Sequence, residues 1–153
     1  MKRLIVLDTG VAGLLTNPRP SPLAKTCRQW FNALQAAGDI IALPEIVDYE
    51  LRREFLLNNA LESIEQLEEL ARGAEYIRLN TEAMRQAAVY WANIRKQGQP
   101  PADRHALDGD VIVAAQATLL EDLGGGMIIA TTNVKHLSRF ADARLWTAIG
   151  VSA

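Results

Sequence analysis

Four acidic side chains have the type and spacing to hold a metal ion together: Asp8, Glu50, Asp108 and Asp110. Carboxylates gathered at one place repel one another and raise each other's pKa, and a divalent cation removes that conflict. A ligand set made of oxygen atoms favours Mg²⁺ or Mn²⁺ over zinc. Such a site can activate water and stabilise a leaving oxygen, so the acids favour phosphodiester hydrolysis.

Two apolar runs that end in polar residues predict where this site lies. Residues 4–7 are aliphatic and run into Asp8, and residues 127–130 run into Thr131, Thr132 and Asn133. If both runs are neighbouring strands of a parallel sheet, Asp8 and Asn133 emerge at its carboxyl edge, where open α/β sheets bind their ligands. Glu50 follows a second strand on the edge of a helical apolar stripe, from which it can lean over that edge.

Each acid also has a purely structural explanation. Asp108 and Asp110 flank Gly109 directly before the apolar run 111–115, where a helix cap contributes about 1 kcal/mol. A cap explains one of these two acids and not both. The functional interpretation therefore depends on all the acids meeting at one edge.

The remaining elements alternate between strands and helices, which predicts an α/β fold with a parallel sheet of about four to five strands covered on both faces. Residues 10–22 read as a Gly/Pro-rich stretch with a short apolar turn at 11–15. We expect strands at 40–43, 75–79 and from 127, a loop at 98–101, and helices at 23–37, 44–57, 61–72, 81–96 and 108–123.

Composition limits the class of protein. The 153 residues fit one domain, spanning 1–153, and the net charge of −2 excludes a general polyanion binder. The longest apolar stretch, 111–120, is too short for a membrane span, and the single Cys27 fits a reducing, cytoplasmic setting. Any contact with nucleic acid must be local, and the candidate basic residues are Arg53, Arg104, Lys135 and Arg139.

Four short motifs in order resemble the PIN-domain nucleases, and most of all the VapC-like toxins of toxin–antitoxin pairs. They are Leu7-Asp8-Thr9, Tyr49-Glu50-Leu51, the block 110–117 and the block 132–137. The resemblance covers essentially the whole chain. It implies a three-layer α/β/α sandwich, Mg²⁺- or Mn²⁺-dependent endoribonuclease activity on RNA, a homodimer, and inhibition by a small antitoxin protein.

Carried over by position, Asp8 and Asp110 match the family's first and third acids, and Glu50 matches its helical glutamate. Asn133 stands where many members carry a fourth acid, and Gly10 departs from the small hydroxyl or asparagine residue often found there. A neutral amide supplies no charge, so we expect one well-occupied metal ion and a weak second one.

Supporting roles follow for the neighbours of these acids. Asp108 is the candidate to supply the charge missing at Asn133. The hydroxyls of Thr132 and Thr9 are candidates to orient a water or a ligand, although such hydroxyls also bond to local backbone.

Other functions compete with metal-dependent cleavage. His105 and His136 are candidates for a metal-free RNA transesterification. A noncatalytic PIN-like module that binds RNA or protein is the alternative from a different class, with Asn133 marking lost activity. The triplet Asp8-Thr9-Gly10 also occurs in aspartic proteases, but their all-β fold does not fit a chain rich in helices.

Overall fold

The computed structural model describes residues 2–98, 104–120 and 125–151, with residues 104–106 described by their backbone alone. Its centre is a five-stranded sheet in the order β3-β2-β1-β4-β5, and every neighbouring pair is parallel. The strands are β1 (Leu4–Leu7), β2 (Ile40–Pro44), β3 (Glu75–Ile77), β4 (Met127–Thr131) and β5 (Ala143–Leu145).

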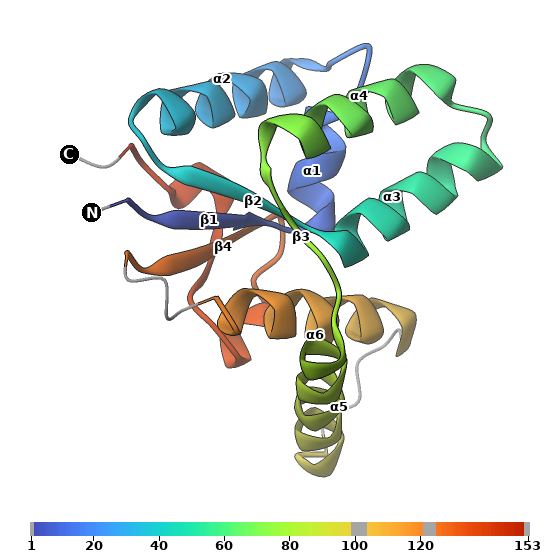
Figure 1. The fold of residues 1–153 in the computed structure, drawn as a ribbon, viewed down its shortest axis with the longest axis vertical. Helices are drawn as coiled ribbons and strands as arrows, with labels where there is room; N and C mark the ends of the chain where they lie inside the picture. Colours follow the sequence, from blue (N-terminus) through green and yellow to red (C-terminus); the bar gives the residue numbers. More distant parts are fainter. Residues whose placement is uncertain (1, 99–103, 121–124, 152–153) are drawn as a thin grey trace.

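Helices cover the sheet on both sides, so the predicted three-layer α/β/α fold is confirmed (Figure 1). Figure 1 shows α1, α2 and α4 above the sheet and α6 with α5 below it. The helices are α1 (Thr9–Leu15), α2 (Pro22–Ala36), α3 (Glu45–Leu57), α4 (Leu61–Gly73), α5 (Thr81–Lys96) and α6 (Arg104–Thr118). Two short 3₁₀ helices, η2 (Leu137–Arg139) and η3 (Trp146–Ala148), follow β4.

The central strands are buried along their whole length, which explains why they read as continuous apolar runs. All four residues of β1 and all five of β4 are buried. Leu7 pairs with Ala130, so the chain after β1 and the end of β4 leave the sheet side by side. The predicted neighbourhood of these two strands is therefore confirmed.

Three features differ from the sequence prediction. Residues 9–15 form the helix α1 instead of a turn, because burial of Val11, Ala12 and Leu15 outweighs the low helix propensity of its glycines. Helix α6 begins at Arg104 and not near Asp108, which places Gly109 inside the helix. The short strand β5 was not predicted.

The predicted loop at 98–101 falls largely outside the described residues, as do residues 121–123 of the last predicted helix. Within the described part of the chain, no helix is long and apolar enough to span a bilayer.

Candidate active site

Asp8 is held at the carboxyl end of β1 by hydrogen bonds from both sides. The backbone N–H of Thr9 donates to its Oδ1 at 2.8 Å, which caps α1, and the Thr131 hydroxyl donates to its Oδ2 at 2.7 Å. Burial raises the pKa of Asp8, while both hydrogen bonds act to lower it. The hydrogen bonds therefore fix the position of the carboxylate, and burial makes its charged form unfavourable.

Glu50 reaches the same region from α3. The Thr9 hydroxyl donates to its Oε1 at 3.0 Å, so Thr9 joins Asp8 through its backbone and Glu50 through its side chain. Burial raises the pKa of Glu50, the Thr9 hydrogen bond and Arg53 lower it, and the charge of Asp8 raises it. Arg53 is a weak counterion, since its Nη2 lies 3.9 Å from Glu50 Oε2 and its side chain is 54% exposed.

Asp110 completes the group from α6. Its pKa rises to about 7 through burial first and then through the charges of Asp8 and Glu50. The charges of Asp8 and Glu50 thus act on Asp110, and the charge of Asp8 acts on Glu50.

The donor set fits a hard divalent cation, but the side chains are not gathered as ligands. Among the described residues, no three His, Cys, Asp or Glu side chains lie close enough together to hold a metal ion. The charge of Asp8 nonetheless raises the pKa of Glu50, and both charges raise the pKa of Asp110, so the three carboxylates form an anionic group of oxygen donors. A cation there would relieve the repulsion that the structure contains.

Asp108 is not brought to this group. It is exposed and lines a recess between α5 and α6 together with Met84, Trp91 and Ile112. Two residues along a helix correspond to a rotation of about 200°, so Asp108 and Asp110 point to different sides of α6. This placement does not support the predicted role of Asp108 as a metal ligand.

Asn133 is joined to Asp8 through Thr131. The Thr131 hydroxyl lies 3.1 Å from both the backbone oxygen and the backbone nitrogen of Asn133, and it donates to Asp8. The Asn133 side-chain oxygen accepts from the backbone N–H of Lys135 at 3.0 Å and shapes the turn after β4. Its amide therefore supports the turn that follows Thr131.

The other predicted supporting residues lie at the surface. Thr132 is exposed and occupies the space in front of Gly10, where an added Cβ would overlap its hydroxyl. Lys135 and Arg139 are exposed on the segment after β4, and the Arg104 side chain lies outside the described atoms. Arg53 is thus the predicted basic residue that the structure joins to an acid of the site.

Two residues of the site were missed by sequence reasoning. Thr131 was overlooked, although the pairing of Leu7 with Ala130 would have aligned the next residues, Asp8 and Thr131. Gly109 was treated as a spacer between two acids, and no signal in the sequence relates it to Glu50.

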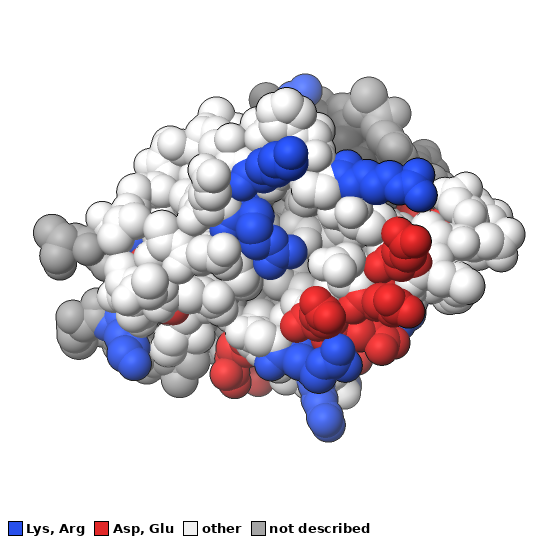
Figure 2. Space-filling model, turned by 90° about the horizontal axis from the view of Figure 1, so that it is seen from above, with Lys and Arg blue, Asp and Glu red and all other residues white. Residues whose placement is uncertain are grey.

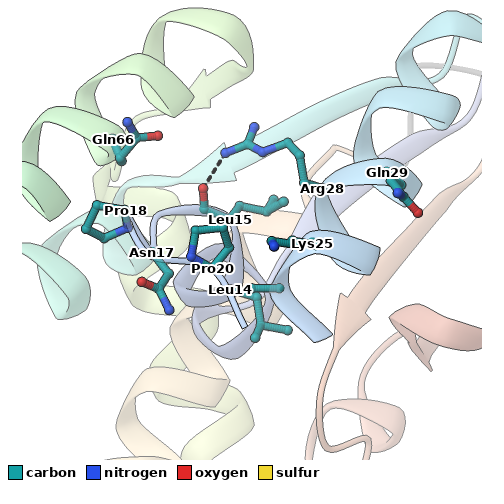
Figure 3. Close-up of a pocket in the computed structure, with 10 residues that line it drawn as sticks. Leu14, Leu15, Asn17, Pro18, Pro20, Lys25, Arg28, Gln29 and Gln66 are labelled. Atoms are coloured by element: carbon teal, nitrogen blue, oxygen red, sulfur yellow. Dashed lines mark hydrogen bonds between the residues drawn. The ribbon is translucent and has the colours of Figure 1, made fainter. Parts of the chain in front are cut away.

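A separate pocket lies between the end of α1, the start of α2 and α4 (Figure 3). Leu14, Pro18, Pro20 and Gln66 line it, and Arg28 donates to the backbone oxygen of Leu15 across its wall. None of the acids described above lines this pocket. The chemistry of the site therefore belongs to the sheet edge and not to this hollow.

Solved structures share this architecture. The chain superposes on the structure of VapBC2 from Rickettsia felis bound to a DNA fragment from the promoter, with a TM-score of 0.69 and 17% sequence identity. The superposition covers 93% of this chain and 96% of that chain. VapBC-1 from nontypeable Haemophilus influenzae gives a TM-score of 0.65 at 22% identity, covering 94% of this chain and 98% of that one. The chain has the PIN-domain fold. FitAcB from Neisseria gonorrhoeae is similar over 95% of this chain and 99% of that chain, with a TM-score of 0.64 and 20% identity.

At these identities the likeness concerns the PIN fold alone, and the chemistry rests on this chain's own residues. No family model matches the sequence, and no curated protein matches it. In this chain, Asp8 follows β1, Glu50 lies on α3 and Asp110 lies on α6, and the charges of the first two raise the pKa of Asp110.

Proposed function

We propose that this protein is a metal-dependent endoribonuclease and the toxin of a toxin–antitoxin pair. The observation that carries the proposal is the effect of the Asp8 and Glu50 charges on the pKa of Asp110 at the carboxyl edge of a PIN-like sheet. Membership of a toxin–antitoxin pair is supported by the solved neighbours, which are VapBC complexes and FitAcB.

Asp8 and Asp110 are the proposed direct ligands of Mg²⁺ or Mn²⁺, and Glu50 is a ligand directly or through water. The bound ion would lower the pKa of an attacking water and neutralise charge on the phosphate. The protein's own contribution is to fix the acids: Thr131 and Thr9 donate to Asp8, and the Thr9 hydroxyl also holds Glu50.

The RNA backbone is proposed to approach over Arg53, with Arg104, Lys135 and Arg139 as further candidate contacts. Charge elsewhere on the surface disfavours an approach over α4. Figure 2 shows acidic side chains gathered over one part of the face formed by α2 and α4, and α4 carries the exposed acids Glu62, Glu65, Glu68 and Glu69. An acidic band of this kind repels a phosphate backbone.

The histidine mechanism receives less support. Within the described residues, His136 Nδ1 is buried without a hydrogen-bond partner, and burial, Lys135 and Arg139 lower the pKa of His136. A neutral imidazole with one nitrogen buried is poorly placed to exchange protons with a substrate. The His105 side chain lies outside the described atoms.

The proposal is tested by RNA cleavage with Mn²⁺, with Mn²⁺ and a chelator, and with the variant Asp8→Asn. We expect cleavage with Mn²⁺ that leaves 5′-phosphate ends, loss of cleavage with chelator, and a loss of about 100-fold or more in Asp8→Asn. Cyclic phosphate ends that persist with chelator would support the histidine route. RNA binding without cleavage would support the noncatalytic module.

Asp108→Asn is the matched variant, because it removes an acid from the same region of α6 that the structure leaves exposed. Wild-type activity in Asp108→Asn restricts the ligand set to the other three acids. A loss equal to that of Asp8→Asn would restore Asp108 to the ligand set.

The antitoxin and the homodimer are proposals of the same kind, and co-expression with the product of the neighbouring open reading frame tests the first. A stable complex that suppresses cleavage is the expected result. Light scattering of the free protein tests the dimer.

A further inference from the structure

Gly109 lies inside α6, one residue before Asp110, and its missing side chain leaves room for the carboxylate of another helix. A Cβ atom built on Gly109 would lie 2.8 Å from Oε2 and 2.9 Å from Oε1 of Glu50, and 3.1 Å from its Cδ. Real Cβ atoms do not approach other atoms this closely. The Glu50 carboxylate therefore occupies space that any other residue at position 109 would fill.

Backbone conformation does not explain this glycine. The described glycines with positive φ are Gly38, Gly98 and Gly126, so Gly109 adopts a backbone that an alanine accepts. Glycine inside a helix costs about 1 kcal/mol relative to alanine. The chain keeps this destabilising residue at the point where α3 and α6 bring two acids together.

The electrostatics of the neighbouring acid agree with this geometry. Glu50 is one of the charges that raise the pKa of Asp110, directly after Gly109 in the chain. Close approach of two carboxylates is unfavourable in the free protein, so packing alone gives no reason to leave room for it. A cation that joins the two carboxylates removes this cost.

We propose that Gly109 is a positioning residue, which lets the Glu50 carboxylate close against α6 beside Asp110 so that both serve one divalent cation. The inference rests on the proposed metal dependence. It makes tight metal binding depend on Gly109, a residue that has no side chain with which to contact the ion.

Gly109→Ala separates this role from a structural one, because it should weaken Mn²⁺ binding without lowering the stability of the metal-free protein. The clashing atoms are the far end of a flexible side chain, so Glu50 rotates away and the fold persists. We expect an unchanged or higher melting temperature without metal. We also expect the Mn²⁺ dissociation constant, measured by titration calorimetry, to be about tenfold higher than in wild type. Cleavage at saturating Mn²⁺ should recover most of the wild-type rate.

Gly73→Ala is the matched control, because a Cβ there meets nothing within 4 Å. It tests the general effect of removing a glycine from a helix and should leave Mn²⁺ affinity unchanged. Equal Mn²⁺ affinity in Gly109→Ala and wild type would overturn the inference while leaving the metal-dependent function intact. Absence of Mn²⁺ binding in wild type and Gly73→Ala would overturn both.

A double-mutant cycle with Glu50→Gln shows whether Gly109 acts through Glu50. If it does, Gly109→Ala should weaken Mn²⁺ binding in the wild-type background and add little in Glu50→Gln. Additive losses would contradict the inference, as would a lower melting temperature of metal-free Gly109→Ala, since either result would mean that the Cβ displaces the backbone of α6.

Discussion

The Thr131 hydroxyl donates a 2.7 Å hydrogen bond to Oδ2 of Asp8 and so ties the end of β4 to the end of β1, across 123 residues of sequence. Thr131 is fully buried, and its hydroxyl also contacts the backbone of Asn133. One side chain thus fixes the first acid of the site and the turn that follows β4.

Thr131→Val keeps the volume of this side chain and removes its hydrogen bond to Asp8. A hydrogen bond to a charged group contributes about 1.5–3 kcal/mol, and without it the pKa of Asp8 rises further above its ordinary value. We expect a lower free energy of unfolding in urea and weaker Mn²⁺ binding at pH 7. Thr131→Ser retains the hydroxyl, and a loss of Mn²⁺ affinity in both variants alike would rule out the hydrogen bond as the cause.

Asp110 predicts a pH dependence of stability in the metal-free protein. Its carboxyl ionises at the ordinary pKa of 3.8 in the unfolded chain but at about 7 in the folded protein, so the folded state binds more protons between these values. The favourable contribution is complete below pH 3.8 and is lost as the pH rises through about 7. Asp110→Asn removes the ionisable group, so this loss of stability at high pH should not occur in the variant.

The measurement for Asp110→Asn is urea unfolding at a series of pH values with chelator present. At pH 8 we expect the variant to be more stable than wild type by about 1–2 kcal/mol, a value reduced for partial exposure of the site. The difference should shrink as the pH falls toward 4. The exposed Asp108→Asn is the control, and a stability gain of equal size and pH dependence there would exclude burial of Asp110 as the cause.

Gly10→Ala places a Cβ against the side chain of Thr132, 3.0 Å from its Cγ2 and 3.3 Å from its Cβ. Thr132 adjoins Thr131, so its displacement disturbs the Thr131 hydroxyl that holds Asp8, and we expect cleavage to fall by about tenfold. Thr132→Ala in the same chain vacates that space and should restore activity. Gly13→Ala, whose Cβ meets Leu51 Cδ2 at an ordinary 3.7 Å, should remain active.

The ion pair of Arg3 with Asp39 predicts a stability effect remote from the site. The Asp39 side chain is 1% exposed, and Arg3 contacts it at 2.8 Å while also donating to the backbone oxygen of Gly150 at 2.7 Å. Arg3→Met should lower the free energy of unfolding by about 3 kcal/mol, because it leaves a buried carboxylate without this partner.

The exposed pair of Arg144 with Asp142 provides the comparison, since both side chains are about half exposed. Arg144→Met should change the free energy of unfolding by less than about 1 kcal/mol. Equal effects in Arg3→Met and Arg144→Met would contradict the argument from burial.

The sequence predicted the central sheet well because β1 and β4 are buried on both faces and read as unbroken apolar runs. It missed α1, whose two glycines hide a helix that is stabilised by burial and by the Asp8 cap. It also placed the start of α6 too late, because Asp108, Gly109 and Asp110 all have low helix propensity and suggest a cap.

Within the site, the place of Asp8 was predictable because a polar residue directly after a buried strand must emerge at the edge of the sheet. The contributions of Thr131 and Gly109 were not, because they arise from contacts through space with Asp8 and Glu50. A periodic pattern reports which face a residue occupies. It does not report which atom of another element fills the space beside it.

The double role of Asp8 bears on how an inactive form of this protein should be made for production and crystallisation. Asp8 caps α1 as well as belonging to the site, so a replacement that cannot accept a hydrogen bond, such as Asp8→Ala, also weakens the start of that helix. Asp110 does not cap a helix, and its charge is unfavourable in the metal-free fold. Asp110→Asn is therefore the better choice for an inactive protein that expresses in quantity.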